Sequence, residues 1–392
     1  MLDVLVVGAG PAGSVAATIL ARAGARVRVL DRACFPRDKL CGDTVNPGTL
    51  ALLRRLGLSS SVEDHGLAVE GMRLTGGNGV VVDGRYPDGL LGRAIVRREV
   101  DWSLLSSAIA AGAQFDSPAA ARRVIVEERR RVRRVAGVTV RCADGAVHNL
   151  GARVTIAADG RRSTIAFGLR LASHPPRPRR WAIGAYFANV AGLSTFGEMH
   201  VRASRYIGVA AVPGGVTNVC LVRPFRSGGP AGRDPASVLV RELAADPMLR
   251  DRFADARLLR PPVVLGPLAV DVQTPAIDGL LLAGDAAGFV DPITGDGLRF
   301  AIRGGELAAI AALETLEHGW AGVHARLAAR RRREFADKQR FNRALRVLVA
   351  SPRAVGAAAC SARFAPGIFR RIIRTAGDCD LCEPSFPAPQ SH

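Results

Sequence analysis

The start of the chain has the hydrophobic pattern of one strand–helix–strand unit. Residues Leu2–Val7 form a short apolar run rich in valine and leucine, which is typical of a buried parallel strand. A helix is predicted over Ala12–Ala23, where small side chains allow close approach to a sheet, and Gly24 is suited to end it. The second strand is predicted over Arg26–Leu30, so Asp31 lies at its carboxyl end.

The middle of the chain changes from a helical period to strand alternation. Residues 99–112 have the helical period, whereas apolar and polar side chains alternate from 121 to 157. The pair Asp144-Gly145 is a strong hairpin signal inside that stretch. Three more strands are predicted between 181 and 224, and a helix over 235–256 is expected to cover the sheet they form.

The last third of the chain returns to buried-strand and helical patterns. Residues Leu280–Ala283 predict a buried strand, and a loop rich in glycine and aspartate follows it. Helices are predicted near 298–317 and 320–347, and shorter helical pieces continue to about 375. The pattern therefore predicts an α/β fold that is interrupted by a β-rich insertion and ends in a helical region.

The charge of the chain is strongly positive, with a formal net charge of +19 and a pI of about 11.1. Only Lys39 and Lys338 are lysines, so almost all of the 54 basic residues are arginine. The arginine clusters at 129–134, 177–180 and 330–333 are scattered, and no aromatic side chains interleave them as base stacking requires. We therefore expect a solvated basic surface and no nucleic-acid partner, in preference to a dedicated polyanion site.

The seven cysteines are odd in number and widely spread, which favours reduced thiols. Cys379 and Cys382 form a single CxxC pair without a second pair at zinc-site spacing, so no metal site is expected. No apolar run reaches the length of about 18 residues that a spanning helix needs, and no secretion signal is apparent, so a cytoplasmic protein is expected.

One C-terminal stretch, 364–374, is amphipathic. It places five apolar side chains among three arginines, which suits either peripheral contact with an anionic membrane or packing against the protein core. The apolar residues are Phe364, Ile368, Phe369, Ile372 and Ile373, and the arginines are Arg370, Arg371 and Arg374.

A glycine cluster between the first strand and the first helix predicts a dinucleotide site. In the GxGxxG motif, Gly8 permits a tight turn, Gly10 lets backbone N–H groups approach a pyrophosphate, and Gly13 lets the helix pack on the strand. The helix N-terminus adds a partial positive charge facing the phosphates. The acidic residue that binds ribose hydroxyls is Asp31. Ala12 and Arg32 complete this part of the predicted site.

Two later segments favour FAD over NAD. Residues 157–163 (AADGRRS) and 282–288 (LAGDAAG) each follow a predicted buried strand, and they resemble the two further fingerprints of FAD enzymes with the hydroxybenzoate hydroxylase fold. The resemblance implies that Asp285 binds a ribityl hydroxyl, with Asp159 in the other fingerprint. Arg97, four residues before Asp101 at the head of a helix, resembles an arginine near the flavin phosphates and ribityl chain in that family.

A narrower resemblance is to the geranylgeranyl reductase family. It rests on residues 35–43 (FPRDKLCGD), with Pro47 behind them, and on residues 284–297 (GDAAGFVDPITGDG). The resemblance places Cys41 over the flavin, where it could position an alkene or relay a proton; small apolar packing is the other interpretation of Cys41. Asp43 is the second candidate for the catalytic role. The cofactor residues implied by these segments are Cys41, Gly42, Gly284, Asp285, Pro292, Gly295, Gly297 and Leu298.

The second loop also has a physical reason to hold a flavin. Pro292 restricts the chain, while Gly295 and Gly297 allow backbone to lie against a flat ring. The helix that begins near Leu298 would direct its positive end at the pyrimidine edge and stabilise negative charge on reduced flavin.

The chain departs from the family where the substrate pocket is expected. The reductases carry a strand with Tyr, Trp and Phe before a Pro, and the corresponding stretch here is 206–213 (YIGVAAVP). Tyr206 and Pro213 match, whereas valines such as Val209 stand near the Trp and Phe positions. We expect Tyr206, Val209 and Pro213 to line a pocket that is apolar but wider than in the family.

The sequence as a whole predicts an FAD-dependent oxidoreductase that acts on a hydrophobic small molecule. Its fold class is α/β, with a Rossmann-like FAD-binding domain, an inserted β-sheet substrate domain and a helical C-terminal region. The FAD-binding domain is expected over 1–75, 97–175 and 265–318, the substrate domain over 76–96 and 176–264, and the helical region with a loose tail over 319–392.

Reduction of carbon–carbon double bonds is the leading hypothesis for the reaction. The alternative is an NAD(P)H-dependent FAD monooxygenase that hydroxylates an aromatic or polyketide-type compound, since both share every FAD motif. A flavin-bearing electron carrier without turnover is a third. No second Rossmann motif is visible, so NAD(P)H is expected to bind transiently.

Overall fold

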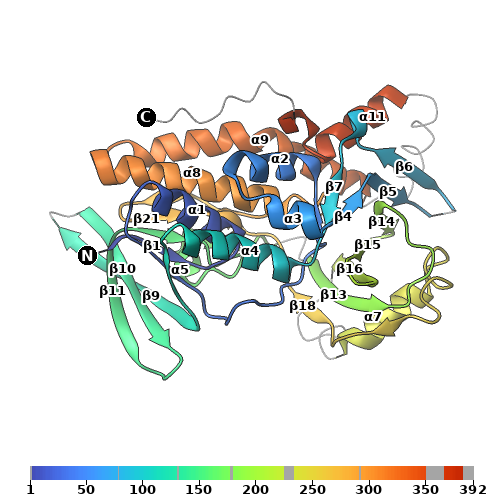
Figure 1. Ribbon diagram of the computed structural model, residues 1–392, viewed down its shortest axis with the longest axis horizontal. Helices are drawn as coiled ribbons and strands as arrows, with labels where there is room; N and C mark the ends of the chain where they lie inside the picture. Colours follow the sequence, from blue (N-terminus) through green and yellow to red (C-terminus); the bar gives the residue numbers. More distant parts are fainter. Residues whose placement is uncertain are drawn as a thin grey trace.

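Two eight-stranded sheets carry the architecture of the described part of the chain (Figure 1). The structure is a computed structural model and describes residues 2–77, 79–129, 132–176, 180–224, 234–290, 293–349 and 366–382. In Figure 1 the first sheet lies on the left with helices above it, and the second sheet lies on the right. The predicted combination of an α/β body, a β-rich insertion and a helical C-terminal region is confirmed.

The first sheet is parallel at its centre, as the βαβ pattern predicted. Its path is β20 (Ala276–Ile277), β21 (Leu280–Leu282), β11 (Val147–Ala157), β1 (Leu2–Val7), β2 (Val27–Leu30) and β8 (Gln114–Asp116). Every pair except β20–β21 is parallel, so the carboxyl ends of β1, β2 and β11 share one edge. That edge carries the glycine cluster and Asp31, which follow β1 and β2.

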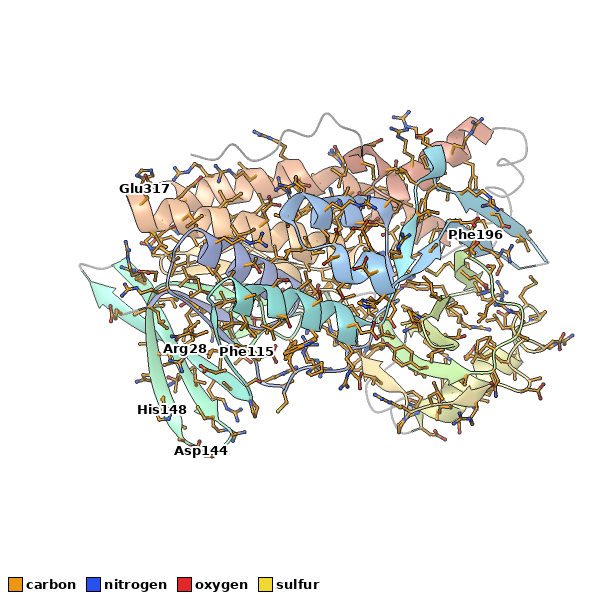
Figure 2. All side chains as sticks on the ribbon, in the orientation of Figure 1. Arg28, Phe115, Asp144, His148, Phe196 and Glu317 are labelled. Carbon is orange, nitrogen blue, oxygen red and sulfur yellow. The ribbon has the colours of Figure 1, made fainter. Side chains whose placement is uncertain are left out.

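A long antiparallel hairpin extends this sheet from β11. It consists of β9 (Ala119–Arg129) and β10 (Val132–Cys142), and β10 pairs with β11. The turn predicted at Asp144-Gly145 is confirmed: Gly145 has a φ of +85°, and the Asp144 carboxylate accepts a hydrogen bond from Ala146 N at 2.9 Å. Figure 2 shows Asp144 at the turn that connects β10 to β11.

Two helices cover one face of the first sheet in close contact with each other. They are α1 (Pro11–Arg22) and α8 (Gly297–His318), and α9 (Val323–Val349) lies beside α8 (Figure 1). A Cβ on Gly305 of α8 would lie 2.2 Å from the carbonyl oxygen of Ala12, so α8 can approach α1 this closely only with glycine there. The opposite face packs on α5 (Thr164–Gly168) and on the hairpin.

The second sheet forms the β-rich insertion. Its path is β17 (Arg257–Leu258), β13 (Arg180–Ala188), β16 (Val216–Pro224), β15 (Arg205–Val212), β14 (Phe196–Arg202), β5 (Gly71–Thr75) and β6 (Val81–Arg85), with β18 (Val263–Leu265) also paired to β13. Helix α7 (Pro235–Ala244) covers one face through a cluster that includes Ile183, Ile207 and Leu239. The other face is turned towards the flavin motifs.

Two boundaries differ from the predictions. Strand β5 pairs with β14, so the second sheet takes in residues 71–75, which were expected in the FAD-binding domain. Helix α7 ends at Ala244 and does not continue to 256, because Asp246 precedes Pro247 and the residue before a proline is biased away from helical geometry.

Smaller elements connect the two sheets. One of them, helix α2 (Pro47–Leu56), was not predicted, although Asn46 caps it and Pro47 is its first residue. These elements are β3 (Thr44–Val45), α2 (Pro47–Leu56), α3 (Ser60–His65), β4 (Leu67–Val69), η1 (Pro87–Gly89), β7 (Gly92–Ala94), α4 (Arg97–Ala110), β12 (Ala172–Ser173), β19 (Asp271–Val272) and η2 (Gly284–Ala287). The C-terminal pieces are α11 (Pro366–Ala376) and η3 (Cys379–Cys382). Within the described ranges, no helix combines the length and apolarity needed to cross a membrane.

Candidate active site

Two adjoining cavities lie between the glycine cluster and the second sheet. The first, here called the apolar cavity, lies between Gly295 and Gly297 on one side and strands β13 to β16 on the other. The second, here called the charged cleft, runs past Gly8, Asp31 and Asp159. The two share Gly10, Lys39, Leu40, Ala158, Gly160, Arg161, Leu265 and Asp285, so they form one continuous space.

The glycine cluster forms a cradle that side chains would block. Gly8 has a φ of +103°, and a Cβ there would lie 2.4 Å from the carbonyl oxygen of Ala158. A Cβ on Gly13 would lie 1.8 Å from the carbonyl oxygen of Gly8. Gly10 is the N-cap of α1 and lines both cavities, and Ala12 lines the apolar one, so the first turn of α1 opens onto the shared space. This is the geometry that a pyrophosphate at a helix N-terminus needs.

Two carboxylates, the buried Asp31 and the half-buried Asp159, follow β2 and β11 beside this cradle. Asp31 accepts hydrogen bonds from Ala9 N and Ala33 N, both at 2.9 Å, which leaves each oxygen room to accept one more from a ribose hydroxyl. Asp159 accepts one from Thr164 N at 2.8 Å, while its Oδ1 is buried without a partner among the described residues. Burial raises the pKa of Asp159. Arg32, predicted with Asp31, lines the charged cleft.

Cations outnumber their carboxylate partners on the cavity wall. Arg97 makes two hydrogen bonds to Asp101, at 2.7 and 2.9 Å, and Arg37 reaches the same carboxylate at 3.1 Å. Although burial alone would lower the pKa of Arg97, Asp101 and Cys41 raise it overall. Burial and the neighbouring Arg97 lower the pKa of Lys39, which lines both cavities.

Arg161 was not singled out from the sequence, although it stands in the second fingerprint. It lines both cavities, its Nε is buried without a partner in the described part of the chain, and burial lowers its pKa. A desolvated cation that faces an open space is a site for an anion. Together with the cradle and the free oxygen of Asp159, it shows that these residues fit a dinucleotide such as FAD.

The second glycine loop faces the first segment across the apolar cavity. Gly295 has a φ of +72°, and Gly297 begins α8, whose first turn lines the cavity with Leu298. Gly284 and Asp285 line the same cavity, and Cys41 and Gly42 lie on its wall. Pro292 lies outside the described residues. The two fingerprint loops therefore line the same cavity.

Asp43 does not line either cavity. Its side chain is fully buried and accepts hydrogen bonds from the Tyr186 hydroxyl at 2.6 Å and from Asn218 Nδ2 at 2.7 Å. Burial raises the pKa of Asp43 to about 6. The predicted catalytic pair thus divides: Cys41 faces the cavity, and Asp43 lies behind it.

The residues predicted on the substrate strand divide between its two faces. Side chains alternate along β15, and Tyr206 and Gly208 line the apolar cavity. Val209 therefore points to the opposite face, where it packs in the core under α7. Pro213 follows the end of β15 in the turn to β16 and is not among the described residues that line the cavity.

The rest of the apolar wall could be found only from the pairing of the strands. Cys220 of β16 lies opposite Gly184 of β13 and Gly208 of β15 in the sheet register. Leu40 fills the space above Gly184, whereas a Cβ on Gly208 would meet no atom closer than 3.9 Å. The remaining apolar lining includes Ala182, Met199, Val222, Leu265, Leu268 and Phe289.

The amphipathic C-terminal helix α11 packs on the protein through part of its apolar face. A Cβ on Gly84 of β6 would lie 2.4 Å from Ile373 and 3.0 Å from Phe369. Figure 1 shows α11 beside β6. Ile368 is 66% exposed, and Arg370 and Arg371 are also exposed. Packing on the core therefore accounts for Phe369 and Ile373, while Phe364 lies outside the described residues.

Sequence and structure comparisons show the family and the fold of the chain. A family model described as FAD binding domain matches residues 1–339. The chain is 34% identical over 321 residues to the menaquinone reductase of Mycobacterium tuberculosis, covering 78% of this chain and 75% of that protein. It is 32% identical over 328 residues to digeranylgeranylglycerophospholipid reductase 2 of Methanopyrus kandleri, covering 80% of this chain and 78% of that protein.

Solved structures with the same fold include enzymes of two kinds. A geranylgeranyl bacteriochlorophyll reductase-like protein of Thermoplasma acidophilum has a TM-score of 0.79 at 21% identity, covering 98% of this chain and 96% of that one. A flavin-dependent brominase has a TM-score of 0.82 at 20% identity, covering 99% and 96%. At these identities the structures support the fold alone. The family match and the reductase relatives show that this chain belongs to the FAD-binding family of FAD-dependent oxidoreductases, in the group related to geranylgeranyl reductases.

Proposed function

We propose that this protein reduces carbon–carbon double bonds of a hydrophobic, isoprenoid-type small molecule. The observation that carries the proposal is the apolar cavity, which lies directly between the flavin loop at Gly295–Gly297 and the floor formed by Gly208 and Cys220. An apolar floor suits an alkene or a prenyl chain, since it offers few polar partners to a substrate. The relatives named for menaquinone and for a digeranylgeranyl lipid support the same substrate class.

Three groups of residues would have separate roles in this reaction. The glycine cradle, Asp31, Arg97, Asp159 and Asp285 would hold FAD, which when bound supplies a hydride. The apolar lining would exclude water from the bond to be reduced. Cys41 faces the cavity and is the group we propose to pass a proton to the substrate carbon, and Asp43 lies too deep to touch it.

We further propose NAD(P)H as a transient electron donor. Beyond the residues assigned to FAD, the charged cleft is also lined by Arg37, Arg162 and Arg260, which suit the phosphates of a second dinucleotide. Anaerobic mixing of the holoenzyme with NADPH and with NADH would test this directly. Bleaching of the flavin band by either donor is expected, and the absence of bleaching with both would exclude nicotinamide donors.

Contact with a membrane surface is proposed for the exposed face of α11. Ile368 lies there beside Arg370 and Arg371, an arrangement suited to anionic lipid. In vesicle flotation with anionic lipid, I368E is expected to reduce the bound fraction, whereas V347E, at a residue of α9 that is 70% exposed, is the matched control. Equal binding by both variants would contradict the proposal.

Reoxidation of the reduced enzyme tests the main proposal. Holoenzyme reduced with dithionite under nitrogen would be mixed with menaquinone, with geranylgeranyl compounds and with aromatic phenols. The flavin band is expected to return with an isoprenoid substrate and to stay bleached with the phenols. Return of the band only after admission of oxygen would favour a monooxygenase.

A further inference from the structure

We infer that Tyr186 and Asn218 are positioning residues for this site: by holding Asp43 they fix the Cys41–Gly42 segment on the wall of the flavin cavity. This inference builds on the flavin site of the proposed function and reassigns Asp43 from a catalytic to a positioning role. The three residues together are called the Asp43 clamp. Two of them come from the second sheet, and neither was visible as a functional residue in the sequence.

The contacts of Asp43 reach three other parts of the chain. Tyr186 on β13 and Asn218 on β16 donate to its Oδ2, and the backbone N–H of Arg97 at the start of α4 donates to its Oδ1 at 3.2 Å. Its own carbonyl accepts a hydrogen bond from Ile95 N at 2.9 Å. Asp43 therefore connects its own segment to strands β13 and β16 of the second sheet and to the start of α4.

Asn218 extends the clamp to the cavity wall itself. Its Nδ2 donates to the carbonyl oxygen of Cys41 at 3.0 Å as well as to Asp43. Tyr186 and Asn218 face each other as partners in the β13–β16 register, and Cys220, two residues further along the same face, lines the apolar cavity. The clamp thus anchors residues 41–43 to the strand pair that forms the cavity floor.

The backbone of Asp43 needs such an anchor. Its φ of +54° lies in the left-handed region, which residues other than glycine adopt rarely and which surrounding contacts must hold. When the hydrogen bonds from Tyr186 and Asn218 are removed, residue 43 loses both of its partners from the second sheet and keeps only those from Arg97 N and Ile95 N. The wall at Cys41 and Gly42 would then shift relative to Gly295 and Gly297 across the cavity.

The proton on Asp43 should control the clamp, since an ionised carboxylate accepts all of these bonds and a protonated one cannot. The titratable groups that face it are Tyr186 on β13, Arg97 on α4, Cys220 on β16 and Cys41 in its own segment. Burial and Asp43 raise the pKa of Tyr186, so the tyrosine stays neutral and remains a donor. Asp43 is thus the group expected to titrate near neutral pH.

The test uses the FAD-loaded protein and three variants, Tyr186→Phe, Asn218→Ala and Asp43→Asn. Thr139→Val is the matched control, because it removes one partly buried side-chain hydrogen bond, to Asn149, in the distant hairpin. The readouts are the absorption spectrum and midpoint potential of bound FAD against pH, followed by the reoxidation rate with substrate. Spectrum and potential need no substrate, so they report on the clamp even where the proposed reaction is wrong.

In the wild type, the flavin spectrum is expected to change with an apparent pKa of about 6, the value given by burial of Asp43. Asp43→Asn should abolish that change, and Tyr186→Phe and Asn218→Ala should shift it. All three should slow reoxidation at saturating substrate by about tenfold or more at similar half-saturation, as expected for a misplaced wall. Spectra, potentials and rates that match those of Thr139→Val would overturn the inference. Tyr186→Phe removes a single oxygen atom, so it carries the test where Asn218→Ala does not fold.

Discussion

Arg97 and Asp101 form a buried, two-pronged ion pair within the first turn of α4, with nitrogen–oxygen distances of 2.7 and 2.9 Å. The side chain of Asp101 is fully buried and that of Arg97 is 8% exposed. The pair holds the guanidinium at the wall of the apolar cavity, beside Lys39. Its geometry requires the planar fork of arginine, which lysine cannot reproduce.

Arg97→Lys should therefore weaken FAD binding. Loss of one charge-assisted hydrogen bond and of the fixed orientation should cost about 1.5–3 kcal/mol, a Kd for FAD about 10- to 100-fold higher. The measurement is fluorescence titration of apoprotein with FAD. Arg54→Lys is the matched control, since Arg54 also donates two hydrogen bonds to a carboxylate, Glu63, but on the surface. Equal Kd values for the two variants would contradict the role of Arg97.

Gly13→Ala should prevent FAD binding, because a Cβ at this position would lie 1.8 Å from the carbonyl oxygen of Gly8. That overlap is with backbone, so the turn or the helix must move. Gly168→Ala is the control, as a Cβ there meets no atom within 4 Å. FAD content of the purified proteins is the readout. A Gly13→Ala protein with full FAD content would show that the turn does not need glycine.

Gly208 and Val209 should respond in opposite ways, since their side chains face opposite sides of β15. Gly208→Leu should fill the apolar cavity and raise KM for substrate, while FAD content stays unchanged. Val209→Ala should lower the unfolding free energy by about 1–3 kcal/mol through a core cavity, with KM unchanged. Urea denaturation and steady-state kinetics separate the two effects. The reverse pattern would restore Val209 to the substrate pocket.

Lys338 should be essential for stability, because it is the buried cation between two carboxylates. Its Nζ lies 3.2 Å from Asp296 and 3.1 Å from Asp378, and it donates to the carbonyl of Ala376 at 3.0 Å. Lys338→Met leaves Asp296 without an ion-pair partner among the described residues, while Asp378 keeps Arg299 at 3.2 Å, and this should cost about 3–5 kcal/mol in urea denaturation. Arg340→Met, at an exposed pair with Asp337 two residues further along α9, should cost almost nothing. Similar losses in both would contradict the assignment.

The titration of Asp43 should make the free energy of unfolding depend on pH. Its pKa is about 6 in the folded protein and about 3.9 in an unfolded chain, so the folded state binds the proton more tightly. The stability that this proton contributes is complete below about pH 4 and is lost as pH rises through about 6. Asp43→Asn should gain about 2–3 kcal/mol relative to wild type between pH 4 and pH 7.

The control for this pH effect is Asp3, which has the opposite shift. Arg26 lowers the pKa of Asp3 to about 2, so its contribution is present above about pH 4 and is lost as pH falls towards 2. Asp3→Asn should therefore lose stability relative to wild type as pH rises from 2 to 4. Urea denaturation across pH measures both variants. A relative stability of Asp43→Asn that does not change between pH 4 and pH 7 would show that Asp43 is not the titrating group.

The parts of the site that lie in continuous motifs could be predicted from the sequence. The cradle at Gly8 and Gly13, Asp31 after β2 and the loop before α8 depend on local backbone geometry, and spacing encodes that geometry directly. Arg161 stands in such a motif, but only its position on the wall of both cavities gives it importance.

The residues that depend on sheet register could not be predicted in the same way. Tyr186 and Asn218 meet Asp43 because β13 pairs with β16 in one register, and nothing local to either strand indicates this. Val209 was assigned by resemblance to a motif, whereas the two-residue period from Tyr206 leads to Gly208. The sequence predicts that α11 is amphipathic. It does not predict that α11 packs on β6, because that strand is distant in sequence.

The central claim is that reduced FAD in this protein saturates a carbon–carbon double bond without oxygen. The most direct measurement is the mass of the product formed by dithionite-reduced holoenzyme from an isoprenoid substrate, under nitrogen and under labelled oxygen. We predict a product heavier by two hydrogen atoms in both atmospheres, with no label incorporated. A product that forms only with oxygen and carries one labelled oxygen atom would contradict the account.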